Sequence, residues 1–177
     1  MRLLGAILAG GRSSRFGSDK ALAMLGSQAL IAHAGASLQD FVAETIVCGR
    51  AQPIAGRTAI ADWPATDLGP LGGLCGALRH AALHDYPAVI SIGCDMPILP
   101  AGLIERLAGA GGAAYVVEAP ILGYWPTRLA MSLERHLSQG GDRSIRRWAA
   151  MIGATPLEAG APIPNVNRPE DLANLQA

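Results

Sequence analysis

The chain has 177 residues, in which 14 Lys and Arg residues are balanced by 14 Asp and Glu residues. Hydrophobic residues make up 50% of the sequence, which excludes a disordered chain, and the balanced charge argues against a non-specific nucleic-acid binder. Because domains typically have about 100–150 residues, we predict a single domain over residues 1–177 with no nucleic-acid partner.

The cysteine content and the length of the apolar runs indicate the cellular compartment of the protein. The three cysteines, Cys48, Cys75 and Cys94, are too few and too widely spaced for a disulfide framework or a zinc site. No stretch approaches the roughly 18 apolar residues of a membrane span, and the apolar start of the chain is short for a secretion signal. We therefore predict a cytoplasmic protein with reduced thiols and no membrane contact.

The first half of the chain alternates predicted strands and helices. The uninterrupted apolar run Leu3–Leu8 is typical of a strand buried on both faces of a parallel sheet. Apolar residues near helical spacing predict a helix over residues 28–38, with Ser27 as its N-cap. Strands are predicted over residues 44–48 and, more weakly, over residues 58–61.

The second half begins with a helix over residues 70–84, since Pro70 suits a first helical turn. The apolar run at residues 86–93 predicts a central strand. The remaining predicted elements are a helix over residues 101–107, strands over 113–118 and 121–125, helices over 128–137 and 144–151, a weak strand over 155–157 and a short helix from Pro169.

This order of elements predicts an α/β fold. Strands that alternate with helices indicate a Rossmann-like, mostly parallel sheet flanked by helices, and the more irregular second half is interpreted as a cap or insertion built onto that sheet. Ligands of such folds bind beyond the carboxyl ends of the strands. The segments that directly follow the predicted strands are therefore the candidate sites.

The segment LAGGRSSRFGSDK, residues 8–20, directly follows the first predicted strand. Its adjacent glycines, Gly10 and Gly11, allow backbone N–H groups to approach a phosphate closely, while Arg15 and Lys20 add positive charge. It matches neither the dinucleotide fingerprint nor the Walker A pattern, because its glycines are wrongly spaced for both. It is either a phosphate-binding loop or a flexible polar loop, and its position after a buried strand favours the first.

Two further segments hold polar side chains suited to a metal or a ligand. Asp95 follows the central predicted strand, where a carboxylate can hold a metal-bound phosphate, although a turn or helix-cap role is the alternative. Because a sheet brings Asp95 to the same edge as residues 8–20, a Mg²⁺ site is favoured. Asn165 and Asn167 can ligate a metal or bind a ligand, but physical grounds alone favour turn and cap roles for them.

Together these segments resemble the nucleotidyltransferase family that includes the molybdenum cofactor guanylyltransferases. The resemblance covers nearly the whole chain through LAGGRSSRFGSDK, GPLGG at residues 69–73, CDMP at residues 94–97 and NVNRPEDL at residues 165–172. The last motif points to the molybdopterin branch of the family, although Arg168 replaces the usual Thr. The resemblance implies a fold of the nucleotide-diphospho-sugar transferase type.

The resemblance also implies which residues bind the nucleotide. The guanine nucleotide is expected to meet the backbone after the first strand and a carboxylate just before the GPLGG segment. The residues implied are Leu8, Ala9, Gly10, Gly11 and Asp62, together with Lys20 and Asp95.

The implied catalytic residues are Lys20, Arg15 and Asp95. Lys20 and Arg15 are expected to hold the phosphates, and Asp95 is expected to bind Mg²⁺. Asn165 and Asn167 are expected to face the pterin or the metal. Arg143 is a further candidate for the anionic pterin phosphate, although a solvated helix face is the favoured interpretation of its segment.

The implied reaction is attack by the terminal phosphate of molybdopterin on the α-phosphorus of GTP, which releases pyrophosphate. The nucleophile is already ionised, so catalysis would rest on alignment and charge neutralisation by Mg²⁺, Lys20 and Arg15. GTP and molybdopterin are then the substrates, and transient contact with molybdoenzymes or insertion chaperones is expected.

Two alternatives to this function stay open. Cys48 stands at the end of the second strand, where the family places an Asn against the nucleotide, and this departure supports a molybdopterin cytidylyltransferase of the same fold. The other alternative is a non-catalytic protein that binds a nucleotide or a cofactor. The intact Lys20 and Asp95 argue against it.

Overall fold

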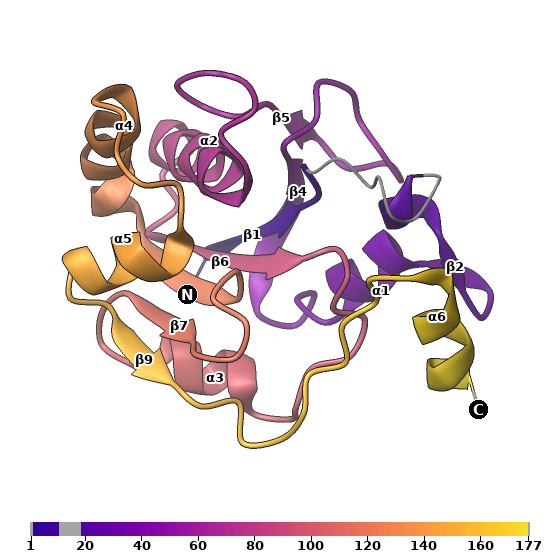
Figure 1. Cartoon of the computed structure of the whole chain (residues 1–177). Coiled ribbons are helices and arrows are strands. Elements are labelled where there is room, and N and C mark those ends of the chain that lie inside the picture. Colours follow the sequence, from indigo (N-terminus) through magenta and orange to yellow (C-terminus); the bar gives the residue numbers. More distant parts are fainter. Residues whose placement is uncertain (1, 11–18, 177) are drawn as a thin grey trace.

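A mostly parallel sheet runs through the protein (Figure 1). The computed structural model describes residues 2–10 and 19–176, and within these ranges seven strands form one sheet in the order β5-β4-β1-β6-β8-β7-β9. The strands are β1 (Leu3–Leu8), β4 (Val42–Cys48), β5 (Ala59–Ile60), β6 (Ala88–Gly93), β7 (Ala114–Val116), β8 (Gly123–Pro126) and β9 (Thr155–Leu157).

The pairing of the strands confirms the predicted α/β class and corrects one expectation. Strand β1 pairs in parallel with both β4 and β6, and β4 pairs in parallel with β5. Strand β8 runs antiparallel to its neighbours β6 and β7, and β7 pairs in parallel with β9. The second half was expected to be a cap or insertion, but its strands extend the same sheet because the buried segment of β8 pairs directly with β6.

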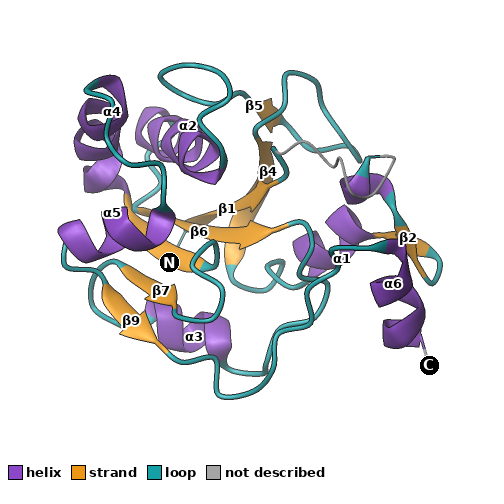
Figure 2. Cartoon of the chain, in the orientation of Figure 1, coloured by secondary structure: helices purple, strands orange, loops and turns teal. Residues whose placement is uncertain are grey.

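Helices cover both faces of the sheet (Figure 2). Helices α1 (Leu30–Ala36) and α3 (Leu103–Ala108) contribute to the buried cluster on one face, whereas α2 (Pro70–Leu83), α4 (Ala130–Ser138) and α5 (Ile145–Met151) contribute to the cluster on the other. Helix α6 (Pro169–Gln176) packs against the small hairpin of β2 (Met24–Leu25) and β3 (Gln28–Ala29). Two 3₁₀ turns, η1 (Lys20–Leu22) and η2 (Thr127–Leu129), complete the described elements.

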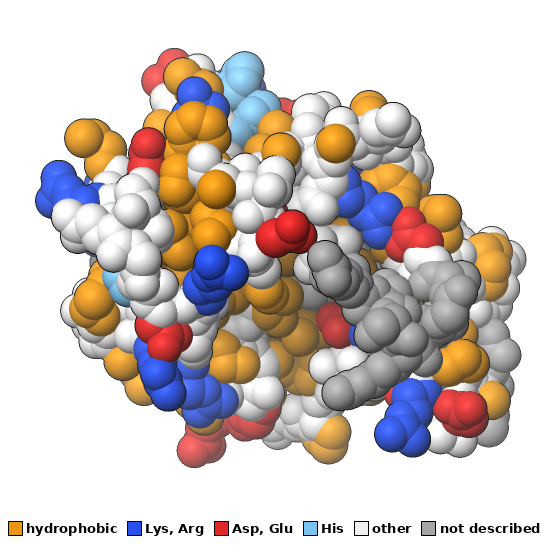
Figure 3. Space-filling model, turned by 45° about the horizontal axis from the view of Figure 1, so that its top comes forward, with side chains coloured by type: hydrophobic (Ala, Val, Ile, Leu, Met, Phe, Trp, Pro, Cys, Tyr) orange, Lys and Arg blue, Asp and Glu red, His pale blue; other side chains and the backbone are white. Residues whose placement is uncertain are grey.

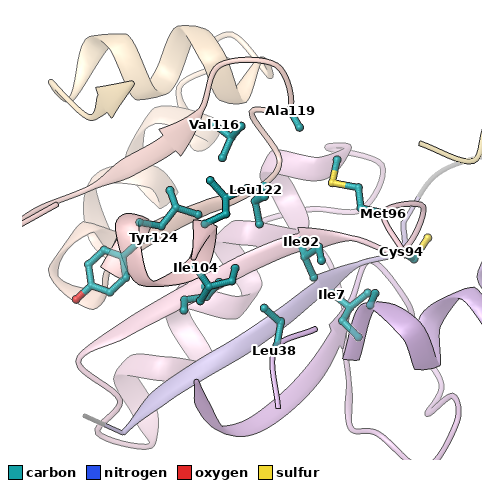
Figure 4. Close-up of a cluster of buried hydrophobic side chains, with 14 of the residues drawn as sticks. Ile7, Leu38, Ile92, Cys94, Met96, Ile104, Val116, Ala119, Leu122 and Tyr124 are labelled. Atoms are coloured by element: carbon teal, nitrogen blue, oxygen red, sulfur yellow. The ribbon is translucent and has the colours of Figure 1, made fainter. Parts of the chain in front are cut away.

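Side chains of the central strands alternate between the two buried clusters. In β1, Leu3 and Ile7 belong to the cluster with α1 and α3, whereas Leu4 and Leu8 belong to the cluster with α2. Figure 4 shows the first cluster, into which Ile7 and Ile92 point from β1 and β6. Every residue of β1 and of β6 is buried, as expected for strands covered by helices on both faces.

The start of helix α1 differs from the prediction. The helix was expected to begin at Gln28 with Ser27 as N-cap, but Gln28 pairs with Leu25 in a hairpin whose turn includes Gly26 at a φ of 62°. Ala29 is the N-cap residue of α1, and its side chain makes no capping hydrogen bond. The Ser27 assignment was therefore wrong, because the strand pairing takes the residues that periodicity assigned to the helix.

The surface and the helix lengths bear on the predicted partners. On the face shown in Figure 3, basic and acidic side chains are interspersed rather than gathered into one basic patch. Within residues 2–10 and 19–176, no helix combines the length and the apolar character needed to cross a lipid bilayer. The cytoplasmic location stays a prediction.

Candidate active site

The candidate site lies where the central parallel strands end. The backbone N–H of Ala9 donates to the carbonyl oxygen of Cys48 at 3.0 Å, and the N–H of Cys94 donates to the carbonyl oxygen of Leu8 at 3.4 Å. These bonds continue the strand pairing beyond β1, β4 and β6. Ala9, Gly10 and Asp95 therefore lie at the same carboxyl edge of the sheet, as the sequence predicts.

Three of the predicted site residues converge on one ammonium group. Lys20 Nζ lies 3.0 Å from Asp95 Oδ2 and 3.1 Å from Asn167 Oδ1, although these residues are 75 and 147 positions away along the chain. The Lys20 and Asp95 side chains are 16% and 24% exposed, so the pair is partly shielded from water yet reachable. The N–H of Val166 donates to the backbone oxygen of Asp95 at 2.9 Å, which fixes the closing segment beside the strand end.

The turn after β6 places the Asp95 carboxylate. The residues on either side of Asp95, Cys94 and Met96, are anchored in the buried cluster of Figure 4. A Cβ atom at Gly93 would clash with Asp95 Oδ1, so the carboxylate occupies the space that the missing side chain leaves. Glycine at this position is therefore required for the observed orientation of Asp95.

A cavity of about 580 Å³ opens beside the end of β1 and contains the second predicted carboxylate, Asp62. Asp62 Oδ2 accepts a hydrogen bond from the N–H of Leu68 at 3.2 Å, whereas Oδ1 is buried and finds no donor among the described residues. Burial raises the pKa of Asp62 above its usual value, and the charge of Asp67 acts in the same direction. The cavity lining comprises Gly10, Gly49, Arg50, Ala51, Ala61, Asp62, Thr66, Asp67 and Gly69.

Two glycines form one wall of this cavity by a close approach of backbones. A Cβ atom at Gly10 would lie 2.8 Å from the Cα of Gly49, a separation that folded chains do not tolerate. Gly49 also has a φ of 81°, which side chains other than glycine rarely adopt. Bare backbone at this position gives a ligand direct access to the strand ends.

Lys20, Asp95 and Asn167 form what we call the lysine cluster, and other predicted residues lie apart from it. Asn165 lines another cavity of about 580 Å³, with Met96 and Glu118 among its neighbours. Arg143 Nη1 donates to the backbone oxygen of Asp67 at 3.1 Å, so it is linked to the loop that lines the Asp62 cavity. The expected grouping of Arg143 with Asn165 and Asn167 stays a prediction.

Part of the predicted phosphate-binding loop lies outside the described residues. Gly11 and Arg15 fall within residues 11–18, which are not among the described residues. Leu8 is described and only 5% exposed, with its side chain in the cluster that α2 covers. Of Leu8, only the backbone can therefore take the nucleotide-binding role predicted for it.

Cys48 does not line the Asp62 cavity. Its side chain is fully buried, and a Cβ atom at Gly73 in α2 would lie 3.3 Å from the Cys48 Cβ. Burial raises the pKa of this thiol well above its usual range, so it stays protonated. At this strand end the neighbouring residue Gly49, rather than Cys48, lines the cavity.

An ion pair beside the cluster was missed by the sequence analysis. Arg50 donates two hydrogen bonds to Asp19, from Nη1 to Oδ2 at 2.6 Å and from Nη2 to Oδ1 at 2.5 Å. The position of Arg50 just after a predicted strand could have indicated that it lies at the same edge of the sheet. No sequence pattern indicated that its partner would be Asp19.

The oxygen atoms around Lys20 are suitable ligands for a divalent cation. Asp95 offers a carboxylate and Asn167 an amide oxygen, which are the hard donors that Mg²⁺ prefers, and an ion on these atoms would take the place that the Lys20 ammonium group occupies in this structure. Among the described residues, no three His, Cys, Asp or Glu side chains gather closely enough to hold a metal by themselves. The donor set therefore fits an ion that substrate phosphates help to hold, as is usual for Mg²⁺.

The fold of this chain is shared with solved α/β nucleotidyltransferases. The chain is similar to the crystal structure of molybdopterin-guanine dinucleotide biosynthesis protein A from Archaeoglobus fulgidus, with a TM-score of 0.76 and 24% identity over 98% of this chain and 96% of that one. Residues 5–154 match the model of the MobA-like NTP transferase domain, and the chain belongs to this family.

Two relatives are molybdenum cofactor guanylyltransferases. The chain is 36% identical to a molybdenum cofactor guanylyltransferase from Cereibacter sphaeroides (strain ATCC 17029 / ATH 2.4.9), over 100% of this chain and 97% of the relative. It is 33% identical to a molybdenum cofactor guanylyltransferase from Rhizobium leguminosarum bv. trifolii, over 98% of this chain and 91% of the relative. Both the predicted family and the predicted enzyme class are confirmed.

Proposed function

We propose that this protein transfers GMP from GTP to molybdopterin, giving the guanine dinucleotide form of the cofactor and pyrophosphate. The observation that carries the proposal is the convergence of Lys20, Asp95 and Asn167 at the carboxyl edge of the sheet. The full-length similarity to molybdenum cofactor guanylyltransferases supports the choice of substrates.

The nucleotide is assigned to the cavity that contains Asp62. Its wall of bare backbone at Gly10 and Gly49 suits close approach of a ligand, and Asp62, which lines the cavity, can accept through Oδ2 a second hydrogen bond from an N–H group of the base or a hydroxyl of the ribose. Gly11 and Arg15 are proposed to bind the phosphates from the loop that precedes Lys20.

The lysine cluster is proposed to perform the chemistry. A terminal phosphate oxygen of the acceptor bonds to the α-phosphorus of GTP, and the bond from that phosphorus to the pyrophosphate oxygen breaks. Lys20 neutralises the charge that spreads over the phosphoryl oxygens, and the partial burial of its side chain strengthens this interaction. Mg²⁺ on Asp95, when bound, neutralises the phosphates and the departing pyrophosphate.

The acceptor is assigned to the closing segment, in which Asn167 contacts Lys20 and Asn165 lines a separate cavity. The segment is held against Asp95 through the backbone of Val166, so an acceptor bound there would present its phosphate near Lys20. Arg143 is proposed to contribute charge to the same substrate. We further propose that residues 1–177 act as a single cytoplasmic domain, which meets molybdoenzymes or insertion chaperones transiently.

The full-length similarity to molybdenum cofactor guanylyltransferases favours GTP over the cytidylyltransferase alternative, and the buried Cys48 side chain does not line the cavity. The test is a titration of the purified protein with GTP, CTP and ATP, with and without Mg²⁺, followed by thermal unfolding. A nucleotide present at 100 times its dissociation constant should stabilise the protein by about 2.7 kcal/mol. We expect a Mg²⁺-dependent response to GTP, whereas a preference for CTP would contradict the proposed base.

The second arm of the test measures transfer itself. Purified protein is incubated with molybdenum-loaded molybdopterin, GTP and Mg²⁺, and the dinucleotide and pyrophosphate are quantified. We expect Asp95→Ala to abolish transfer and Asp40→Ala, which removes an exposed carboxylate, to leave it unchanged. Full activity of Asp95→Ala would refute the assignment of the metal to Asp95. Nucleotide binding without transfer by the wild type would favour the non-catalytic alternative.

A further inference from the structure

Asp19 fixes the short turn that carries Lys20. Its Oδ1 atom accepts a hydrogen bond from the N–H of Ala21 at 3.1 Å, which makes Asp19 the N-cap of η1. The turn is only three residues long, so it has little stability of its own and depends on external contacts. The contacts of Asp19, together with the burial of Ala21 in the core, therefore set the direction in which Lys20 leaves the backbone.

Arg50 connects Asp19 to the edge of the sheet. The guanidinium group makes two hydrogen bonds with the carboxylate, at 2.6 and 2.5 Å, a geometry that fixes orientation as well as distance. Arg50 follows directly after Gly49, whose N–H donates to the backbone oxygen of Ile60 in β5 at 2.9 Å. The Arg50–Asp19 pair therefore links the N-cap of η1 to the edge of the sheet, in addition to the contact of Lys20 with Asp95.

The pair remains ionised at neutral pH. The hydrogen bond from Arg50 lowers the pKa of Asp19, and the same bond raises the pKa of Arg50. The Arg50 side chain is 24% exposed and the Asp19 side chain 34% exposed, so solvent screens this pair less than a fully exposed surface pair. Both Nη atoms of Arg50 are engaged by Asp19, although Arg50 lines the proposed nucleotide cavity.

From this geometry we infer that Arg50 and Asp19 are positioning residues, which hold the backbone at Lys20 so that its ammonium group meets Asp95 and Asn167. They act through Lys20 rather than by touching the substrate. The inference rests on the proposed function for its catalytic consequence, but the position of Lys20 can be measured independently. The competing explanation is that Arg50 leaves Asp19 and binds a nucleotide phosphate itself.

Kinetics separates these explanations. We expect Arg50→Gln and Asp19→Asn each to lower kcat by about 10- to 100-fold, because a misplaced catalytic group costs up to about that much. The KM for GTP should change by less than about threefold, and the double variant should be no slower than the slower single variant. If Arg50 binds phosphate itself, Arg50→Gln raises the KM for GTP and Asp19→Asn does not, and this outcome overturns the inference.

Asp142 and Arg147 provide a matched control. Asp142 Oδ1 accepts a hydrogen bond from the N–H of Ser144 at 2.8 Å, and Arg147 Nη1 pairs with Asp142 Oδ2 at 2.6 Å. Like Asp19, Asp142 accepts the backbone N–H two residues further along the chain and pairs with an arginine, but the Arg147 side chain is 76% exposed and the N-cap of α5 is Ser144. We expect Arg147→Gln to leave kcat, KM and thermal stability unchanged.

A second readout does not depend on activity. Lys20 is the only lysine in the sequence, so an amine-selective acetylating reagent followed by peptide mass spectrometry reports on this one side chain. Labelling should be slow in the wild type, because Nζ is bound by two acceptors and only 16% of the side chain is exposed. We expect faster labelling by about three- to tenfold in Asp19→Asn and Arg50→Gln, but not in Arg147→Gln.

The labelling and kinetic results together distinguish a failure of the positioning role from a failure of the proposed function. Unchanged labelling in both Asp19→Asn and Arg50→Gln, measured under conditions where circular dichroism shows folded protein, overturns the positioning role even if activity falls. Faster labelling in both variants, in a protein whose wild type transfers no GMP to molybdopterin, refutes the proposed function and retains the positioning role. Asp19→Asn keeps a side-chain acceptor for the N–H of Ala21, so this variant is expected to fold.

Discussion

The buried carboxylate of Asp62 should cost the protein stability in the absence of ligand. One carboxylate oxygen accepts the N–H of Leu68, while the other is buried and has no donor among the described residues. An unsatisfied buried polar atom costs about 1–3 kcal/mol, and we take about 1 kcal/mol because the carboxyl group as a whole is only partly buried and solvent screens it. We therefore expect Asp62→Asn to raise the free energy of unfolding by about 1 kcal/mol at neutral pH.

The pH dependence of this effect has a definite sign. Burial raises the pKa of Asp62 in the folded protein above its value in the unfolded chain. The native state therefore binds more protons than the unfolded state as pH rises above about 4, and stability is lost with rising pH. Below that pH the carboxyl is protonated in both states, so the advantage of Asp62→Asn should disappear there.

Thermal unfolding without nucleotide tests the prediction. For a chain of this length, 1 kcal/mol corresponds to about 2–4 °C in Tm, so Asp62→Asn should melt that much higher near neutral pH and show a smaller difference at mildly acidic pH. Asp85→Asn is the control, because Asp85 is exposed and its φ of 57° suits Asn. A lower Tm for Asp62→Asn at neutral pH, or a difference that does not vary with pH, would refute the reasoning.

Three further predictions concern the strand ends and the core. Gly93→Ala should displace the Asp95 carboxylate and reduce transfer by about 10-fold or more, whereas Gly112→Ala, where a Cβ meets nothing within 4 Å, should have no effect on activity. Ser91→Ala should lower the free energy of unfolding by about 1–3 kcal/mol, measured by urea titration, because Ser91 Oγ accepts the buried indole N–H of Trp125 at 2.8 Å. An unchanged urea midpoint would contradict this role. The three cysteine thiols are all buried, with pKa values raised by burial, and should react with a maleimide only after denaturant is added.

The fold could be predicted well where the sequence has a strong local signal, such as an uninterrupted apolar run or a proline suited to a helix start. The run Leu3–Leu8 has no alternation, and the structure covers both of its faces with helices. The helix that begins at Pro70 was also predicted with its start in the correct place. In both cases a strong local preference and the tertiary environment favour the same structure.

The prediction failed where pairing between segments overrides local pattern. Residues 28 and 29 continue a helical periodicity, yet they pair as β3 with β2, and helix α1 starts later. The strands of the second half are short, and they join the sheet because β8 pairs with β6, β7 with β8 and β9 with β7, contacts that their own sequences do not reveal. Hydrogen-bonded partners far apart in sequence cannot be read from periodicity.

The same distinction applies to the candidate site. Asp95 and Lys20 were selected because they follow strands or glycine-rich turns, and the sheet brings such positions to one edge. Arg50 and Asp19 were missed because their side chains meet only in the folded chain. Cys48 was expected near the nucleotide, but side chains alternate along a strand, and this one points beneath the sheet edge into the core.

The hydrogen bond from Val166 to Asp95 joins a segment that is synthesised late to the end of β6, which is synthesised much earlier. The chain leaves the ribosome in sequence order, so β1, β4, α2 and β6 emerge and can pair while the closing segment is still being synthesised. Lys20 and Asp95 can then come together before Asn167 exists. A nascent chain of this kind has its sheet before it has its complete active site, so guanylyl transfer should begin only once the closing segment has docked against the finished sheet.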